Sequence, residues 1–159
     1  MKQAELASWL RIIVWIAALI GILFCFLIAP LAGKQVIVIE PALSQIFWPF
    51  LLLIWLTAIP FFLALWQCLK IIRNVAADNS FCQDNARYLT LISRLALVEC
   101  ALYAATAVTL AIANIFYPGL MVMIVVIIFC AIAIAIAAAM LSHLVLKASL
   151  MKAEQDLTV

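Results

Sequence analysis

The sequence has little charge. Only 10% of its 159 residues are Asp, Glu, Lys or Arg, whereas 71% are hydrophobic. Soluble globular domains carry about 25% charged and about 45–50% apolar residues, so a soluble domain of this composition is excluded. Disorder is excluded as well, because disordered segments combine low hydrophobicity with high charge density. The surroundings of this chain are therefore predicted to be mostly lipid.

The residue types that build common catalytic motifs are also scarce. The chain has three glycines and one histidine, which leaves no glycine-rich phosphate loop and no HExxH metal site. Its five cysteines form no CxxC pair or other metal-ligand spacing. We therefore expect no enzyme activity, no catalytic residues, no metal and no cofactor. The net charge of +2 is too small to indicate direct nucleic-acid binding.

The apolar residues are gathered in four long runs. A membrane-spanning helix needs about 20 mostly apolar residues, and each run meets that length. The sequence thus predicts an all-α fold: a single integral membrane bundle of four transmembrane helices that occupies the whole chain. The predicted spans cover about residues 9–31, 46–69, 88–116 and 120–146.

Prolines and β-branched residues interrupt this pattern in the first half of the chain. Pro30 is expected to close the first span, and the β-branched stretch 36–39 predicts a short extended piece on the membrane surface. Pro60 lies inside the second run and should kink that helix by releasing the carbonyl of Leu56. Thr57 is close enough in sequence to help satisfy the freed backbone.

The basic residues are distributed unevenly between the two sides of these spans. Lys34 alone falls on one side. An excess of Lys and Arg marks the cytoplasmic side, so both termini are predicted to be cytoplasmic. The other side has eight basic residues: Lys2, Arg11, Lys70, Arg73, Arg87, Arg94, Lys147 and Lys152.

Small residues recur at helical spacing within the spans. Lipid gives no hydrophobic drive for helix association, so helix interfaces favour small residues that allow close approach. These faces predict packing within one chain, and a homodimer contact is the alternative. They comprise Ala17, Gly21 and Cys25 in the first run, Ala101, Ala105, Ala107 and Ala111 in the third, and Ala131, Ala135, Ala138, Ala139 and Ser142 in the fourth.

A few polar groups fall inside the spans, where they are costly and are candidate functional residues. Glu99, His143 and Gln67 each lie three to five residues inside a basic residue of their own helix. We hypothesise that they meet in one polar cluster in the inner leaflet, either as a structural latch or as a proton-coupled or ligand-responsive site. Pairing of Glu99 with Tyr103 is the alternative to the cluster. The residues of this hypothesis are Glu99, His143, Gln67, Arg11 and Tyr103.

The polar connection between the second and third spans predicts a helix start. Ser80 and Gln83 have capping-box spacing, and Asp84 lies in the first turn, where a negative charge suits the helix dipole. Phe81 is an apolar residue in this polar segment and could staple the new helix or dip into the bilayer surface.

Two motifs resemble a known family. The run Phe81-Cys82-Gln83-Asp84-Asn85, followed by Arg87, is similar to a signature of the bacterial membrane family called domain of unknown function 2975. The final residues, which include Glu154, Asp156, Leu157 and Thr158, resemble that family's acidic ending. The family usually has Ser or Thr where this chain has Cys82, a poor N-cap, so capping is expected from Ser80 or Asp78.

The resemblance implies a bacterial inner-membrane protein whose relatives are often encoded beside small helix-turn-helix regulators. The leading hypothesis is therefore a regulatory or scaffolding partner of a cytoplasmic protein, with a helix-turn-helix transcription regulator as the implied partner. It would be bound through Phe81–Tyr88 and Glu154–Val159, unless these two motifs simply pack on each other and close the bundle. The alternative function is a small proton-coupled transporter or exporter that uses Glu99.

Overall fold

The computed structural model describes residues 3–39, 41, 44, 47–77, 79–112 and 118–156. Within these ranges the chain is helical and contains no strand. Four helical rods are long and apolar enough to cross a membrane, if the first three elements are taken as one rod. The all-helical prediction is confirmed. The elements are α1 (Gln3–Leu23), the π-helix η1 (Phe24–Ile28), α2 (Ala29–Ile39), α3 (Phe47–Ala76), α4 (Gln83–Ile112) and α5 (Pro118–Asp156).

The first rod continues past the point where Pro30 was expected to end it. The extended piece predicted at residues 36–39 is wrong, because α2 is helical through Ile39. Pro30 is the second residue of α2, and a first-turn position tolerates a missing N–H. Gly33 lets α2 approach α3 closely, since a Cβ there would lie 2.6 Å from Cε2 of Phe47. In lipid the helix also satisfies its own backbone, which an isolated extended segment cannot do.

A π-helical turn precedes Pro30 and has a clear local cause. The backbone N–H of Ala29 donates to the carbonyl of Phe24, five residues earlier. In this register the partner of the Cys25 carbonyl would be the N–H of Pro30, which proline lacks. The indole Nε1 of Trp55 on α3 donates to the Cys25 carbonyl instead, at 3.2 Å.

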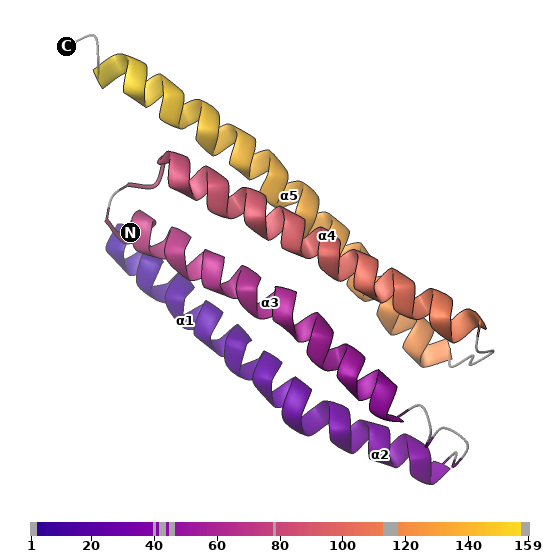
Figure 1. Cartoon of the computed structure of the whole chain (residues 1–159). Helices are drawn as coiled ribbons and strands as arrows, with labels where there is room; N and C mark the ends of the chain where they lie inside the picture. The colour runs from indigo at the N-terminus through magenta and orange to yellow at the C-terminus, as the bar shows by residue number, and fades with distance from the viewer. Residues whose placement is uncertain are drawn as a thin grey trace.

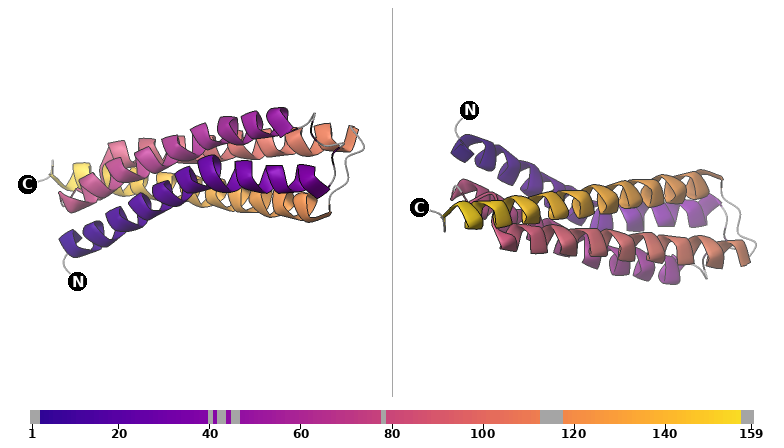
Figure 2. Two further views of the ribbon diagram at one scale, coloured as in Figure 1. Left: turned by 90° about the horizontal axis from the view of Figure 1, so that it is seen from below. Right: turned by 90° about the horizontal axis from the view of Figure 1, so that it is seen from above.

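The rods pack in chain order, with α1 on α3, α3 on α4 and α4 on α5 (Figure 1). Among the described residues, α1 makes no backbone contact with α4 or α5, so the bundle is open on one side. The start of α1, the end of α5 and the α3–α4 connection lie together at what we call the termini end (Figures 1 and 2). Towards this end α1 diverges from the other helices (Figure 2).

The small-residue stripe of α5 faces α4. The hydroxyl of Ser142 donates to the carbonyl of Ala86 at 2.7 Å, and the hydroxyl of Ser93 donates to the carbonyl of Ala135 at 2.8 Å. Thr90 lies 2.8 Å from Ser142 across the same contact. This stripe is thus an intramolecular interface, as predicted. Its buried members are Ala131, Ala135, Ala138 and Ser142.

The other small faces differ from one another. Gly21 of α1 lies against α3, where a Cβ would meet Cε1 of Phe61 at 2.8 Å. By contrast, Ala101, Ala105 and Ala111 of α4 are exposed, whereas Ala107 on the same helix is half-buried.

Candidate functional site

The helix registers decide which of the predicted cluster residues share a depth. Because Ser142 bonds to Ala86, His143 lies beside the start of α4. Glu99 is thirteen residues further along α4 than Ala86, which corresponds to roughly 20 Å. His143 is exposed and does not join Glu99, so this part of the predicted cluster is wrong. The reason is that α4 begins at Gln83, so Arg94 lies three turns inside the helix and not near its start.

Gln67 and Arg11 also lie apart from Glu99. The pairs Asn74–Asn85 and Thr57–Tyr103 fix the antiparallel register of α3 and α4. In that register Gln67 lies about seven residues, or roughly 10 Å, closer to the termini end than Glu99. Arg11 is exposed on α1, which has no backbone contact with α4 within the described ranges.

Tyr103 is the predicted residue that the structure does place beside Glu99. It lies one turn further along α4. Its hydroxyl is 3.4 Å from Oγ1 of Thr57 on α3. Thr57 in turn donates to the carbonyl of Ile54 at 2.9 Å, and not to that of Leu56 as predicted. Tyr103 is therefore the donor in its bond with Thr57.

Two buried side-chain oxygens in α3 and α4 have no hydrogen-bond partner within the described part of the chain. They are Oε2 of Glu99 and Oε1 of Gln67. Pro60, which is also buried, lies inside an α3 that is continuous from Phe47 to Ala76. The middle of the molecule thus holds a carboxyl group for which the neighbouring helices supply no described donor.

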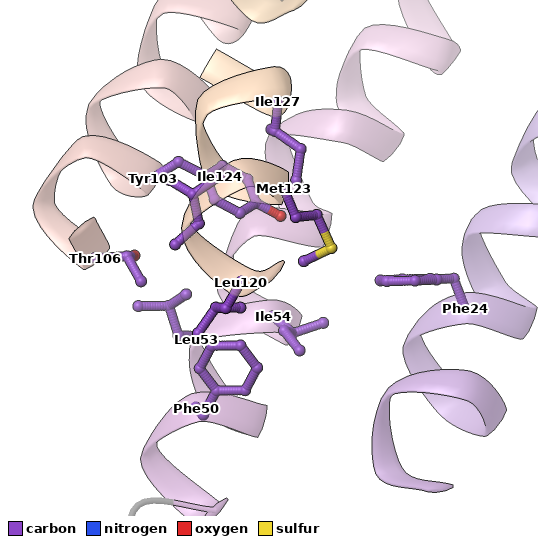
Figure 3. A pocket seen from close by; sticks show the side chains of 10 residues that line it. All are labelled: Phe24, Phe50, Leu53, Ile54, Tyr103, Thr106, Leu120, Met123, Ile124 and Ile127. Carbon is purple, nitrogen blue, oxygen red and sulfur yellow. The ribbon is translucent and has the colours of Figure 1, made fainter. Parts of the chain in front are cut away.

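A small cavity lies beyond Tyr103, towards the far end of the bundle (Figure 3). Its volume is about 40 Å³, and η1, α3, α4 and α5 all contribute to its walls. Tyr103 and Thr106 are its polar members, and the Thr106 hydroxyl already donates to the carbonyl of Leu102. The cavity has room for about one or two water molecules and is too small for an organic substrate.

The second candidate region is the α3–α4 connection at the termini end. Asn85, which is 1% exposed, is the centre of its hydrogen bonds. The amide of Asn74 on α3 donates to Oδ1 of Asn85 at 2.7 Å, and Nδ2 of Asn85 donates to the carbonyl of Ser80 at 2.9 Å. The backbone N–H of Asn85 also donates to the carbonyl of Cys82 at 3.1 Å. We call Asn74, Ser80, Cys82 and Asn85 the asparagine clamp.

The clamp replaces the side-chain cap that was predicted for α4. The Ser80 hydroxyl makes no hydrogen bond within the described part of the chain, so the predicted capping box with Gln83 is wrong. The Ser80 carbonyl is what the clamp binds, because Asn85 reaches back across the turn. Asp78, the other predicted cap, lies outside the described residues.

The clamp turns other motif residues outward. Phe81 is 57% exposed, and Asp84 and Arg87 are exposed as well. Cys82 is half-buried, and its sulfur lies 3.6 Å from the Asn74 amide. Next to this surface, Nζ of Lys70 lies 5.3 Å from the centre of the Tyr88 ring. This cation–π contact is a further link between α3 and α4.

The C-terminal motif lies beyond the packed part of α5. The helix continues through Asp156, fourteen residues or roughly 21 Å past the Ser142 contact. Glu154 and Asp156 are therefore helical positions, whereas Leu157 and Thr158 lie outside the described residues.

Several residues of these sites were missed in the sequence analysis. Asn74, Thr90 and Ser93 make hydrogen bonds between helices, and Trp55 completes the backbone of η1. A signal existed for Asn74 alone, which lies in a polar segment one turn after Lys70. No group of three or more His, Cys, Asp or Glu that could hold a metal occurs among the residues described.

Comparison with known proteins gives one match. A family model described as a protein of unknown function (DUF2975) covers residues 31–159. The matched region contains both the asparagine clamp and the C-terminal motif. No curated protein and no solved structure matches the chain.

Proposed function

Since this chain belongs to the DUF2975 family of proteins of unknown function, we propose from its own geometry that it is a multi-pass membrane protein that docks a cytoplasmic protein at its termini end. The observation that carries the proposal is the exposure of Phe81, which is 57% exposed on a turn held by buried Asn85. A large apolar side chain fixed on a polar surface is a typical anchor of a protein interface.

The charge distribution supports a cytoplasmic docking surface. Arg87 and Asp84 flank Phe81, so the surface combines one apolar anchor with charges of both signs. Exposed lysines at Lys147 and Lys152 of α5 belong to the same end. This basic end is the side that the excess of Lys and Arg assigns to the cytoplasm.

The proposed partner is a small helix-turn-helix transcription regulator, and the protein would hold or modulate it at the membrane. Such a role needs no catalytic group and no transport path. It requires a rigid surface that faces the cytoplasm, which the asparagine clamp would supply. The helical extension of α5 beyond Ser142 would add a second contact for the same partner.

Site-specific photo-crosslinking in native membranes tests this proposal. A photoreactive residue at Phe81 should capture a discrete cytoplasmic protein, and removal of the last six residues should weaken the capture. The matched control is Phe129, which is 72% exposed on the membrane-spanning part of α5 and should capture none. Crosslinks from position 81 to lipid alone would contradict docking and would show that Phe81 dips into the bilayer.

A second candidate function, a proton-coupled carrier, rests on the unpartnered Oε2 of Glu99. An ionisable group inside a membrane span is a candidate proton carrier. Vesicles that contain the purified protein and a pH-sensitive dye would test it. A carrier should dissipate an imposed pH gradient faster as wild type than as Glu99→Gln, and equal rates would contradict this function.

A further inference from the structure

A long groove runs along the contact between the first rod and α3. Its volume is about 500 Å³, and its walls are almost entirely apolar. Cys25 and Phe26 of η1 form one side, and α3 forms the other from Trp55 to Trp66. Trp55 is 38% exposed and Trp66 is 61% exposed, so the groove is open laterally. At this depth the surroundings of the helices are lipid chains.

The length of the groove matches one leaflet of a bilayer. Trp55 and Trp66 are eleven residues apart on α3, which corresponds to about 16 Å. The hydrocarbon core of a bilayer is about 30 Å thick, so one leaflet spans about 15 Å. Trp66 lies near the termini end, where aromatic belts meet the headgroups. Ala58, about one turn from Trp55, leaves the space that a larger side chain would fill.

A basic side chain stands above the mouth of the groove on α3. Arg73 follows Trp66 by seven residues, or about two turns, so it lies on the same face of the helix and roughly 10 Å higher. It is exposed and makes no ion pair with any described residue.

A second basic side chain stands opposite on α1. Arg11 lies on the stripe of α1 that faces α3, between buried Ala7 and half-buried Val14. Gly21 contacts Phe61, and counting ten residues back from it places Arg11 at about the level of Arg73. Arg11 is exposed because α1 diverges from α3 towards this end (Figure 2), and it too has no ion pair within the described ranges.

We propose that the groove is a binding site for an anionic phospholipid of the termini-end leaflet. An acyl chain lies between η1 and α3, and the phosphate lies between Arg11 and Arg73. Two guanidinium groups that form no ion pair with the described residues, above an apolar slot of one-leaflet depth, complement the charge and the length of this lipid. The indole N–H of Trp66 has no hydrogen-bond partner among the described residues and can donate to an ester oxygen below the phosphate. The site is independent of the docked protein partner.

Native mass spectrometry of the full chain tests the proposal. The protein is extracted in mild detergent from vesicles of phosphatidylcholine with a minor fraction of phosphatidylglycerol. Wild type should retain phosphatidylglycerol preferentially. Arg11→Gln and Arg73→Gln should each lower this retention roughly fivefold, which corresponds to about 1 kcal/mol. Ala58→Phe should lower retention of both lipids by filling the groove.

Arg87→Gln is the matched control, because Arg87 is exposed at the same end but lies on α4, away from the groove. It should leave lipid retention unchanged. Equal retention of the two lipids by wild type would overturn the proposal. A loss with Arg87→Gln as large as that with Arg73→Gln would also overturn it, because the effect would then be general surface attraction.

A second measurement depends on the wild-type fold alone. Phosphatidylglycerol with brominated acyl chains should quench tryptophan fluorescence more strongly than brominated phosphatidylcholine at the same mole fraction. Trp66→Phe separates the contribution of Trp66 from that of the other four tryptophans, of which Trp55 also lines the groove. Equal quenching by the two lipids would overturn the proposal.

Discussion

The indole nitrogen of Trp55 lies 3.2 Å from the carbonyl oxygen of Cys25, which joins α3 to the π-helical turn of the first rod. Phenylalanine at position 55 would leave that carbonyl unpaired in apolar surroundings. We expect Trp55→Phe to lower the free energy of unfolding by about 1–3 kcal/mol, the cost of an unsatisfied buried acceptor. Reversible unfolding in bicelles measures it.

Two variants make this prediction specific. Trp15→Phe is the control, because Trp15 is 63% exposed on α1 and should tolerate the change. Pro30→Ala restores the missing N–H, so Trp55→Phe should cost less in that background than in wild type. The same cost in both backgrounds would contradict the link between Pro30 and the Cys25 carbonyl.

The asparagine clamp leads to a second prediction. Asn85→Ala removes two side-chain hydrogen bonds, which leaves the Ser80 carbonyl unpaired and the Asn74 amide with only its weak contact to the Cys82 sulfur. We expect a loss of about 2 kcal/mol or more in the free energy of unfolding. The turn should also open, so a maleimide should label the thiol of Cys82 faster. Arg87→Ala, on the exposed side of the same turn, should change neither quantity; a matching effect there would refute the clamp.

The α4–α5 interface can be tested with two neighbouring alanines. Ala135 is 3% exposed against α4, whereas Ala137 is exposed. Ala135→Leu should cost about 1–3 kcal/mol by overpacking, and Ala137→Leu should be nearly neutral. Unfolding in bicelles compares the two. Similar costs at both positions would show that the stripe is not the closely packed face.

Glu99 leads to a prediction with a small expected change. No described group donates a hydrogen bond to its buried Oε2, so Glu99→Gln removes no bond. The free energy of unfolding should therefore stay within about 1 kcal/mol of wild type. A loss of several kcal/mol in the same unfolding assay would mean that the carboxyl group binds a partner, such as an ordered water or an ion. Tyr103→Phe, which loses only the bond to Thr57, is the comparison.

The orientation in the membrane can be tested with reporter fusions. We expect a fluorescent protein fused after Val159 to be fluorescent and an alkaline phosphatase fused there to be inactive, because the positive-inside rule assigns this end to the cytoplasm. A phosphatase fused after Lys34, truncating the chain there, should be active. An active phosphatase at the C-terminus would reverse the assignment.

The sequence predicted the features that depend on composition and spacing. Four spans follow from hydropathy, and the buried face of α5 follows from small residues at helical intervals. The basic residues did not predict which residues of different helices lie at the same depth. Arg94 lies three turns inside α4, whereas Lys147 lies near the level at which α4 begins. That difference is why His143 and Glu99 are far apart.

Features that depend on three-dimensional pairing were also missed. The Cys25 carbonyl accepts a hydrogen bond from Trp55, thirty residues away, and Asn85 accepts one from Asn74 on the preceding helix. No local pattern in the sequence predicts either of these hydrogen bonds. The helical state of residues 36–39 was missed because β-branched residues favour strands in water, whereas a helix keeps its backbone satisfied in lipid.

The chain-order packing of the rods has a consequence for biogenesis. Each rod after the first contacts the rod synthesised immediately before it, because α3 packs on α1, α4 on α3 and α5 on α4. Contacts between neighbours in sequence close short loops and form quickly. A newly inserted helix therefore meets its partner already in the bilayer, so the molecule can assemble stepwise during translation, and the α4–α5 contact forms last.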